Sequence, residues 1–169
     1  MKFFAREMQR IFKRGNAAYI CGNGGSLSMA SHFAEELVGK FEKERKALPV
    51  YALTNVDAIT AIGNDYGFEY IFSRQIEAYG KEGDMLIVLT TSDAREGEAH
   101  SKNLLYALQV AKEKKMQCAI LGSEKTNNLR SYGLFIKIPG KSTAEIQNNQ
   151  LAFIHEVCRE IDKGFNDNL

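Results

Sequence analysis

Short apolar runs alternate with longer stretches of helical periodicity along the whole chain, and this alternation limits the folds that the chain can adopt. Each run holds four to six residues and is rich in Val, Ile, Leu or Ala, as buried strands are. Strands separated by helices pair in parallel, because each helix carries the chain back to the same end of the sheet. We predict five such strands, at residues 17–21, 50–53, 85–90, 117–121 and 134–138.

Helical periodicity fills the intervals between these strands. The pattern indicates an α/β protein in which an open parallel sheet of five strands has helices on both faces, a three-layer arrangement. The chain has 169 residues and no linker rich in Pro, Gly or Ser, so residues 1–169 are expected to form a single domain. We predict helices at residues 2–14, 26–40, 56–63, 68–79, 101–115, 127–131 and 143–163.

Charge and composition argue against several function classes. Lys and Arg number 22 against 21 Asp and Glu, so the net charge of +1 gives no field that would attract nucleic acid. No apolar run reaches the roughly 18–20 residues that cross a bilayer, and no signal-peptide pattern is present, so no membrane partner and a cytoplasmic location are expected. Cys21, Cys118 and Cys158 lie far apart in apolar surroundings, which favours buried free thiols.

The N-terminal helix at residues 2–14 combines basic residues with Phe3, Phe4, Met8 and Phe12. This spacing is typical of a helix with one wet and one apolar face, and a helix lying on a membrane surface is the less favoured alternative. The apolar face requires a partner, which we expect a neighbouring subunit to provide.

A glycine-rich turn follows the first strand. Gly22–Gly25 leave the strand, and Ser26 is placed to cap the next helix. Glycines let backbone N–H groups approach an anion closely, and the helix N-terminus adds partial positive charge. The turn therefore predicts a phosphate site, with a purely structural strand-to-helix turn as an equally frequent alternative.

Hydroxyl groups gather after the strand at residues 85–90. Thr90, Thr91 and Ser92 end that strand, and Ser101 begins the following helix. Clustered hydroxyls beside helix N-termini can hold phosphate, whereas the alternative makes Ser101 an ordinary helix cap and the threonines ordinary strand residues. Residues 93–100, "DAREGEAH", fit neither period, and because ligands bind at strand ends in open α/β sheets they are a candidate lid.

Two pairs of side chains on separate helices have spacings suited to chemistry. His32 and Glu36 are four residues apart and share one helix face, so they can bind a cation or orient a base, although an isolated pair of this kind is more often a solvated contact. Gln147 and His155 lie about two turns apart on the last helix, on roughly the same side. Glutamine is an uncommon zinc ligand, and His155 has the alternative of a partly buried histidine with a hydrogen-bond partner.

Five segments together resemble one known family. They are "CGNGGSLSMASHFAEELVGKF", "ALTNVDAITAIGNDYGFEYIFSRQIEAYG", "EGDMLIVLTTS", "SKNLLYALQVAKEKKM" and "IQNNQLAFIH". Over nearly its whole length the chain is similar to SIS domains of the phosphoheptose isomerase type, the sedoheptulose 7-phosphate isomerases. The resemblance implies a flavodoxin-like SIS fold, a homotetramer with shared active sites, and conversion of the phosphosugar sedoheptulose 7-phosphate to D-glycero-D-manno-heptose 7-phosphate, which leads to heptose for lipopolysaccharide or capsule in bacteria.

The resemblance also implies a zinc cofactor and a set of site residues. Glu36 is expected to act as the base at carbon, and His155 as the acid and base at the sugar oxygens. The positions that match the zinc ligands of the family are His32, Glu36, Gln147 and His155. The positions that match its substrate and phosphate contacts are Asn23, Ser26, Thr90, Thr91, Ser92, Ser101 and Gln147.

The chain departs from the family pattern at several points. Residues 93–100 lengthen a family loop, and an inward Asp93 would repel phosphate unless Arg95 offset its charge. Lys40 and Ala144 stand where Arg and Asp are common, which removes an ion pair, and the N-terminal helical region is shorter than usual.

Two alternatives to this function stay open at the level of the sequence. One is a non-catalytic SIS module that binds a phosphosugar or a replication-initiator protein, and the other is an isomerase of a different phosphosugar. Retention of His32, Glu36, Gln147 and His155 favours an enzyme, since a binding module has no need for an acid and base pair.

Overall fold

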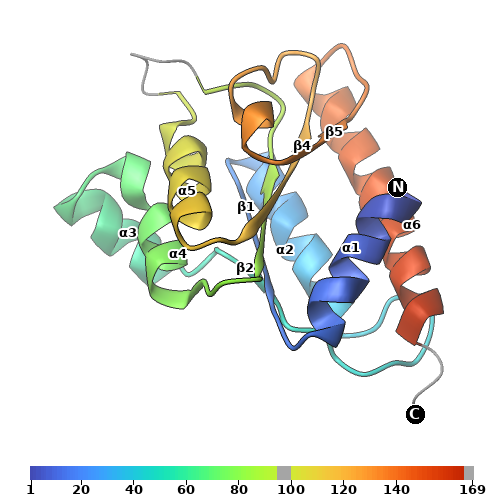
Figure 1. Cartoon of the computed structure of the whole chain (residues 1–169). Coiled ribbons are helices and arrows are strands. Elements are labelled where there is room, and N and C mark those ends of the chain that lie inside the picture. The colour runs from blue at the N-terminus through green and yellow to red at the C-terminus, as the bar shows by residue number, and fades with distance from the viewer. Residues whose placement is uncertain (95–99, 166–169) are drawn as a thin grey trace.

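The computed structural model describes residues 1–94 and 100–165 and shows a parallel sheet between two layers of helices (Figure 1). The sheet has the strand order β2-β1-β3-β4-β5, and every neighbouring pair is parallel, as predicted. The strands are β1 (Ala18–Gly22), β2 (Val50–Ala52), β3 (Met85–Leu89), β4 (Gln117–Gly122) and β5 (Leu134–Lys137).

The helices divide between the two faces of the sheet (Figure 1). One face is covered by α1 (Lys2–Lys13), α2 (Gly25–Val38) and α6 (Thr143–Phe165). The other is covered by α4 (Ser73–Tyr79), α5 (Lys102–Glu113) and the short 3₁₀ helices η1 (Phe68–Tyr70) and η2 (Leu129–Tyr132), with α3 (Val56–Asp65) at its margin. Of the described helices, none combines the length and the apolar character that a membrane crossing requires.

Alternate residues of each central strand supply the two cores. Ala18 and Ile20 of β1 point toward the core beneath α1, α2 and α6, whereas Tyr19 and Cys21 point toward the core beneath α4 and α5. Both faces of the sheet are therefore apolar, which explains the nearly continuous apolar runs in the sequence. Each fully buried side chain such as Ile20 contributes about 1.5–3 kcal/mol. The three cysteines are buried and free, as predicted.

The apolar face of α1 finds its partner within the same chain, which corrects the expectation of a neighbouring subunit there. Phe4 and Met8 are buried, and the Phe4 ring lies 6.1 Å from the ring of Phe153 on α6. Gln9 adds a hydrogen bond to the Glu160 carbonyl of the same helix. Only Phe3 among the four predicted apolar residues is exposed.

The predicted helix at residues 68–79 is also corrected, because the structure divides it into η1 and α4. The break lies at Ile71 and Phe72, both of which are buried. A change of axis at this point buries these two neighbours together while Phe68 and Tyr70 face outward, which a single straight helix would not allow. The predicted helix at 127–131 is the 3₁₀ helix η2.

The strand order places a crevice at the ends of β1 and β3. These strands are neighbours in the sheet, yet β1 is followed by α2 on one face and β3 by α5 on the other. The chain thus leaves the two strands in opposite directions, and in open α/β sheets ligands bind at such a divergence.

Candidate functional site

The glycine-rich turn after β1 brings backbone close to the strand end. Gly24 has φ of 53° and is the residue that precedes α2, so the helix begins one residue earlier than predicted and Ser26 lies inside its first turn. The predicted capping role of Ser26 is therefore wrong. Gly25 provides space, since a Cβ there would collide with the side-chain amide of Gln147 on α6.

Asn23 is held by a reciprocal pair of amide hydrogen bonds. Its Nδ2 donates to Oδ1 of Asn103 at 3.0 Å, and Nδ2 of Asn103 donates back to Oδ1 of Asn23 at 2.7 Å. Asn103 is buried in the first turn of α5, so it fixes the Asn23 amide between the two diverging helices. No periodic signal marks Asn103 in the sequence, because its role depends on two segments that meet only in the fold.

The backbone of the hydroxyl cluster after β3 accepts hydrogen bonds from residues of the loop that follows β4 and from a residue of α6. Ser123 Oγ donates to the Thr91 carbonyl, and Thr126 Oγ1 donates to the Ser92 carbonyl at 2.8 Å. The buried Gln150 donates through Nε2 to the carbonyl groups of Thr90 and Leu121. These bonds fix the backbone that presents the Thr and Ser side chains.

A pocket of about 650 Å³ opens where these segments meet. Ser101, which lines it, has a left-handed backbone with φ of 58°, and within the described helix α5 its side chain makes no capping bond. All seven predicted substrate and phosphate contacts lie around this pocket. Its lining residues are Asn23, Gly24, Gly25, Ser26, Phe68, Thr90, Thr91, Ser92, His100, Ser101, Thr143 and Gln147.

The beginning of the segment 93–100 is anchored away from the pocket. The two carboxylate oxygens of Asp93 accept hydrogen bonds from the backbone N–H groups of Asn128 and Leu129, at 2.8 and 3.1 Å. Asp93 therefore caps η2 and does not turn toward a phosphate. The predicted offset by Arg95 and the central part of the candidate lid fall outside the described residues.

A second group of side chains joins α2 to α6. His32 Nε2 lies 2.9 Å from His155 Nε2, and 3.4 Å from Oε1 of Glu36. His32 is one-third exposed and Glu36 is 16% exposed, so the group is open to solvent on one side. The predicted sharing of a helix face by His32 and Glu36 is confirmed, and His155 joins them from the distant helix.

The donor atoms of His32, Glu36 and His155 all lie within 4.8 Å of one another. Two imidazole nitrogens and one carboxylate oxygen match the three protein ligands of many catalytic zinc sites. The chemistry of this donor set fits a divalent metal ion. Cys158 is buried nearby, where burial, with the Glu36 charge as a lesser cause, raises the pKa of its thiol to about 12. Its sulfur does not belong to the group of donor atoms.

Gln147 lies apart from this cluster along α6. The helices α2 and α6 run side by side in the same direction, because Gly25 contacts Gln147 near their beginnings and His32 contacts His155 further along. Eight residues separate Gln147 from His155, a rise of about 12 Å. The structure thus places Gln147 in the pocket, and its role as a metal ligand stays a prediction.

The ring of His155 packs against Phe41, which belongs to the segment that follows α2. Phe41 stacks on His155 with ring centroids 5.3 Å apart and an interplanar angle of 24°. On Phe41 lies the guanidinium of Arg159, which also pairs with Glu42 at 2.8 Å. These contacts restrict the orientation of the His155 ring.

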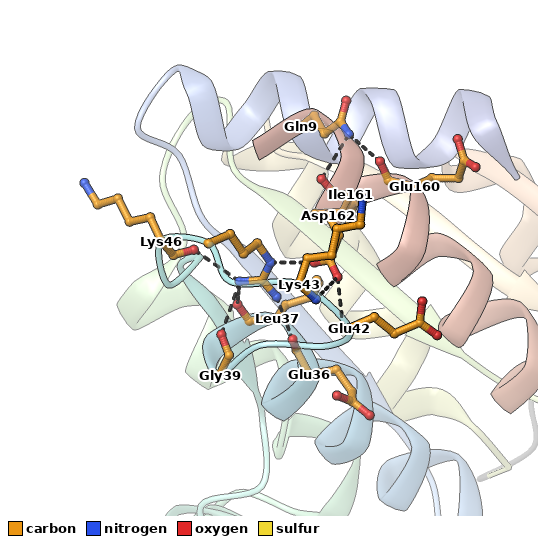
Figure 2. A network of polar contacts seen from close by, with 11 residues as sticks. Gln9, Glu36, Leu37, Gly39, Glu42, Lys43, Lys46, Glu160, Ile161 and Asp162 are labelled. Carbon is orange, nitrogen blue, oxygen red and sulfur yellow. Dashed lines mark hydrogen bonds and ion pairs between the residues drawn. The ribbon is translucent and has the colours of Figure 1, made fainter. Parts of the chain in front are cut away.

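A buried ion pair holds the same segment against α6 (Figure 2). Arg45 Nε donates to Oδ1 of Asp162 at 2.9 Å, and both side chains are almost completely buried. The other guanidinium nitrogens of Arg45 donate to the carbonyl groups that end α2, including that of Glu36 at 2.6 Å. Removal of one partner would leave a buried charge, which costs about 3–5 kcal/mol. The network thereby fixes the end of α2 that carries Glu36.

Comparisons with known proteins agree with this geometry. The family model described as "SIS domain" matches residues 2–123. The chain is 47% identical over 157 residues to a phosphoheptose isomerase of Campylobacter jejuni, a match that covers 90% of this chain and 80% of that protein. Among solved structures, phosphoheptose isomerases from Francisella tularensis and Neisseria gonorrhoeae share 36% and 34% identity, with TM-scores of 0.86 and 0.83, each match covering 95% of this chain and 83% of that chain.

The parallel sheet with its crevice between β1 and β3, and the match over residues 2–123, define an SIS-domain protein. The identities to phosphoheptose isomerases over most of the chain specify the family within this class. The chain belongs to the phosphoheptose isomerase family of enzymes.

Proposed function

We propose that this enzyme converts sedoheptulose 7-phosphate to D-glycero-D-manno-heptose 7-phosphate through an enediol. The observation that carries the proposal is the meeting of His32 and Glu36 with His155, beside a pocket lined by hydroxyl and amide groups, in a chain of this family. The isomerisation moves a carbonyl group from C2 to C1 of the sugar and requires acid and base groups of this kind.

The pocket suits the phosphate group of the sugar. Its hydroxyl and amide donors and the beginnings of α2 and α5 can surround an anion, and helix N-termini favour negative charge. The phosphate is distant from the reacting carbons, so its binding energy positions the sugar. From Gly25 to His32 the rise along α2 is about 10 Å, which is comparable to the length of an extended seven-carbon chain.

The proton transfers are assigned to the cluster. Glu36 removes a proton from C1 of the ketose while the carbonyl oxygen at C2 gains one, which gives the enediol. His155 moves protons between the two oxygens, and Glu36, after exchanging its proton with solvent, gives a proton to C2 as the C1 hydroxyl loses its own. His32 lies against both side chains and orients them.

Zinc is the metal that we propose for this cluster. His32, Glu36 and His155 would hold it, with Gln147 as the fourth ligand expected from the family. When bound, zinc supplies a Lewis acid that lowers the cost of negative charge on adjacent sugar oxygens.

We also propose a homotetramer with active sites shared between subunits. Large exposed apolar side chains gather between residues 56 and 70, where Val56 is 68% exposed and Phe68 is 59% exposed. Phe68 also lines the pocket, so a second copy that covered this surface would lie beside the site. The wider proposal is that residues 1–169 act as one SIS domain in the cytoplasm and supply heptose for bacterial lipopolysaccharide or capsule.

Replacement of the proposed base tests the reaction. We expect Glu36→Gln to lower kcat on sedoheptulose 7-phosphate about 10²–10⁴-fold, because general base catalysis contributes that much. Glu113 is exposed on α5, on the other face of the sheet, and provides the control, so Glu113→Gln should keep activity within a few-fold of wild type. Equal activity of Glu36→Gln and Glu113→Gln would refute the assignment. A fully folded wild type without turnover would instead support a non-catalytic binding module, and turnover of other ketose phosphates alone would indicate a different substrate.

A further inference from the structure

We propose that His100 is a phosphate-contacting residue of the pocket and the cationic side chain that the pocket can offer to a phosphate. The inference rests on the proposed function in one respect, since it takes the pocket as the site of the phosphomonoester group. It assigns a ligand-binding role to the last residue of the segment 93–100, which lengthens a loop of the family and whose role was open at the level of the sequence.

His100 contacts the hydroxyl cluster and lies just before α5. Its Nε2 lies 2.9 Å from Oγ of Ser92, so the imidazole reaches the hydroxyl cluster at the end of β3. It directly precedes Ser101, which begins α5, and both residues line the same pocket. The ring therefore stands at the pocket wall, beside Ser92.

The other described side chains around the pocket are uncharged, so the imidazole of His100 differs from them in its possible charge. Among the described lining residues, His100 is the only one whose side chain can carry positive charge, because the others are glycine, hydroxyl, amide or aromatic residues. Asp93, the nearest described acid in the segment, uses both carboxylate oxygens on η2. A phosphomonoester carries between one and two negative charges near neutral pH.

A charged donor changes the strength of phosphate recognition. Hydrogen bonds between an ionised donor and phosphate are roughly twice as strong as bonds between neutral groups. Hydroxyl and amide groups alone would hold the phosphate by neutral bonds and by the helix N-termini. His100 therefore favours phosphorylated sugars over neutral sugars of the same length, and the segment 93–100 contributes to substrate selection through this residue.

Binding of inorganic phosphate tests the inference without any need for turnover. We expect His100→Gln, which keeps a neutral hydrogen-bonding group, to weaken phosphate binding about tenfold in isothermal titration calorimetry of the zinc-loaded protein. Lys102→Met provides the matched control, because it removes a positive charge two residues away that does not line the described pocket. The control should bind phosphate within about twofold of wild type. Equal affinity of His100→Gln and wild type would overturn the inference, and so would equal losses in the two variants.

Nuclear magnetic resonance provides a second readout, in which the effect of phosphate is followed on the wild-type protein. The chain has three histidines, so imidazole spectra contain few signals and His100→Gln identifies the one that belongs to His100. Phosphate should shift that signal as the pocket fills, and an unmoved His100 signal would contradict the proposal. If phosphate binding depends on His100 but no sugar phosphate is isomerised, the proposed function fails while this inference stands. If sedoheptulose 7-phosphate is isomerised but the His100→Gln variant binds phosphate as tightly as wild type, the proposed function stands and this inference fails.

Discussion

Gly22 at the end of β1 and Gly25 at the beginning of α2 have neighbours of different kinds. Substitution of the first is therefore expected to affect folding, and substitution of the second to affect binding. A Cβ at Gly22 would lie 2.8 Å from the backbone carbonyl carbon of Ser26 and 2.9 Å from the Leu89 carbonyl oxygen, neither of which can move freely. A Cβ at Gly25 would meet only the side-chain amide of Gln147. Gly22 is therefore required for the packing of the backbone, whereas Gly25 leaves space for the side chain of Gln147 in the pocket.

We expect the two alanine variants to fail in different ways. Gly22→Ala should lower the free energy of unfolding by about 1–3 kcal/mol, because overpacking against backbone is costly. Gly25→Ala should fold with unchanged or slightly higher stability, since alanine favours helices, but should lose about tenfold in kcat/KM as Gln147 is displaced. Denaturant unfolding and steady-state kinetics check both. A destabilised Gly25→Ala with normal kinetics would show that Gln147 has no part in binding.

Individual residues were predictable to the extent that their signal was local. The spacing of His32 and Glu36 predicted a shared helix face, and the cluster geometry confirms it. Asn103 and His100 carried no such signal, since their partners Asn23 and Ser92 belong to other segments. The capping role expected of Ser26 was wrong because the positive φ of Gly24 starts the helix earlier.

At the scale of elements, α3 stands out because none of its ten residues is buried. An isolated helix of this length is marginal in water, so packing against another surface is expected to stabilise it. The N-terminus of α3 is capped, because the side chain of Asn55 accepts a hydrogen bond from the Ala58 N–H. What α3 lacks within the described chain is a surface that covers Val56 and its neighbours.

The tetramer proposal predicts that α3 contributes to contacts between copies. Wild type should sediment at four times the chain mass of 18.9 kDa. Val56→Asp, a change that the N-terminal turn of the helix tolerates electrostatically, should shift the equilibrium toward smaller species because it places a charge in an apolar interface. Glu113→Ala, an exposed change on α5, should leave the mass unchanged. A wild type that sediments as a monomer would contradict the proposal, and an unaffected Val56→Asp tetramer would place the interface elsewhere.

The strands were more predictable than the helices. All five strands follow apolar runs in the sequence and match the prediction to within a residue at each end. The helix expected at 68–79 failed because periodicity continues through Ile71 and Phe72, while their joint burial requires a change of axis. Tertiary packing, and not local periodicity, thus determines where this predicted helix is divided.

At the scale of the whole molecule, the strand order creates the site. Alternating strands and helices predicted a parallel sheet, but they did not fix which strands are neighbours. The order places β1 beside β3, so the turn after β1 meets the hydroxyl cluster after β3. The parallel approach of α2 and α6 then brings together His32 and His155, which are 123 residues apart.

The central claim is that this arrangement moves a proton between neighbouring sugar carbons. The most direct measurement is isomerisation of sedoheptulose 7-phosphate by the zinc-loaded wild-type protein in heavy water. A base that exchanges its proton with solvent should leave deuterium at C2 of the heptose product. Mass spectrometry and proton spectra of the product would show one deuterium at that position. Turnover that leaves C2 free of deuterium, or no turnover with zinc bound, would contradict the account.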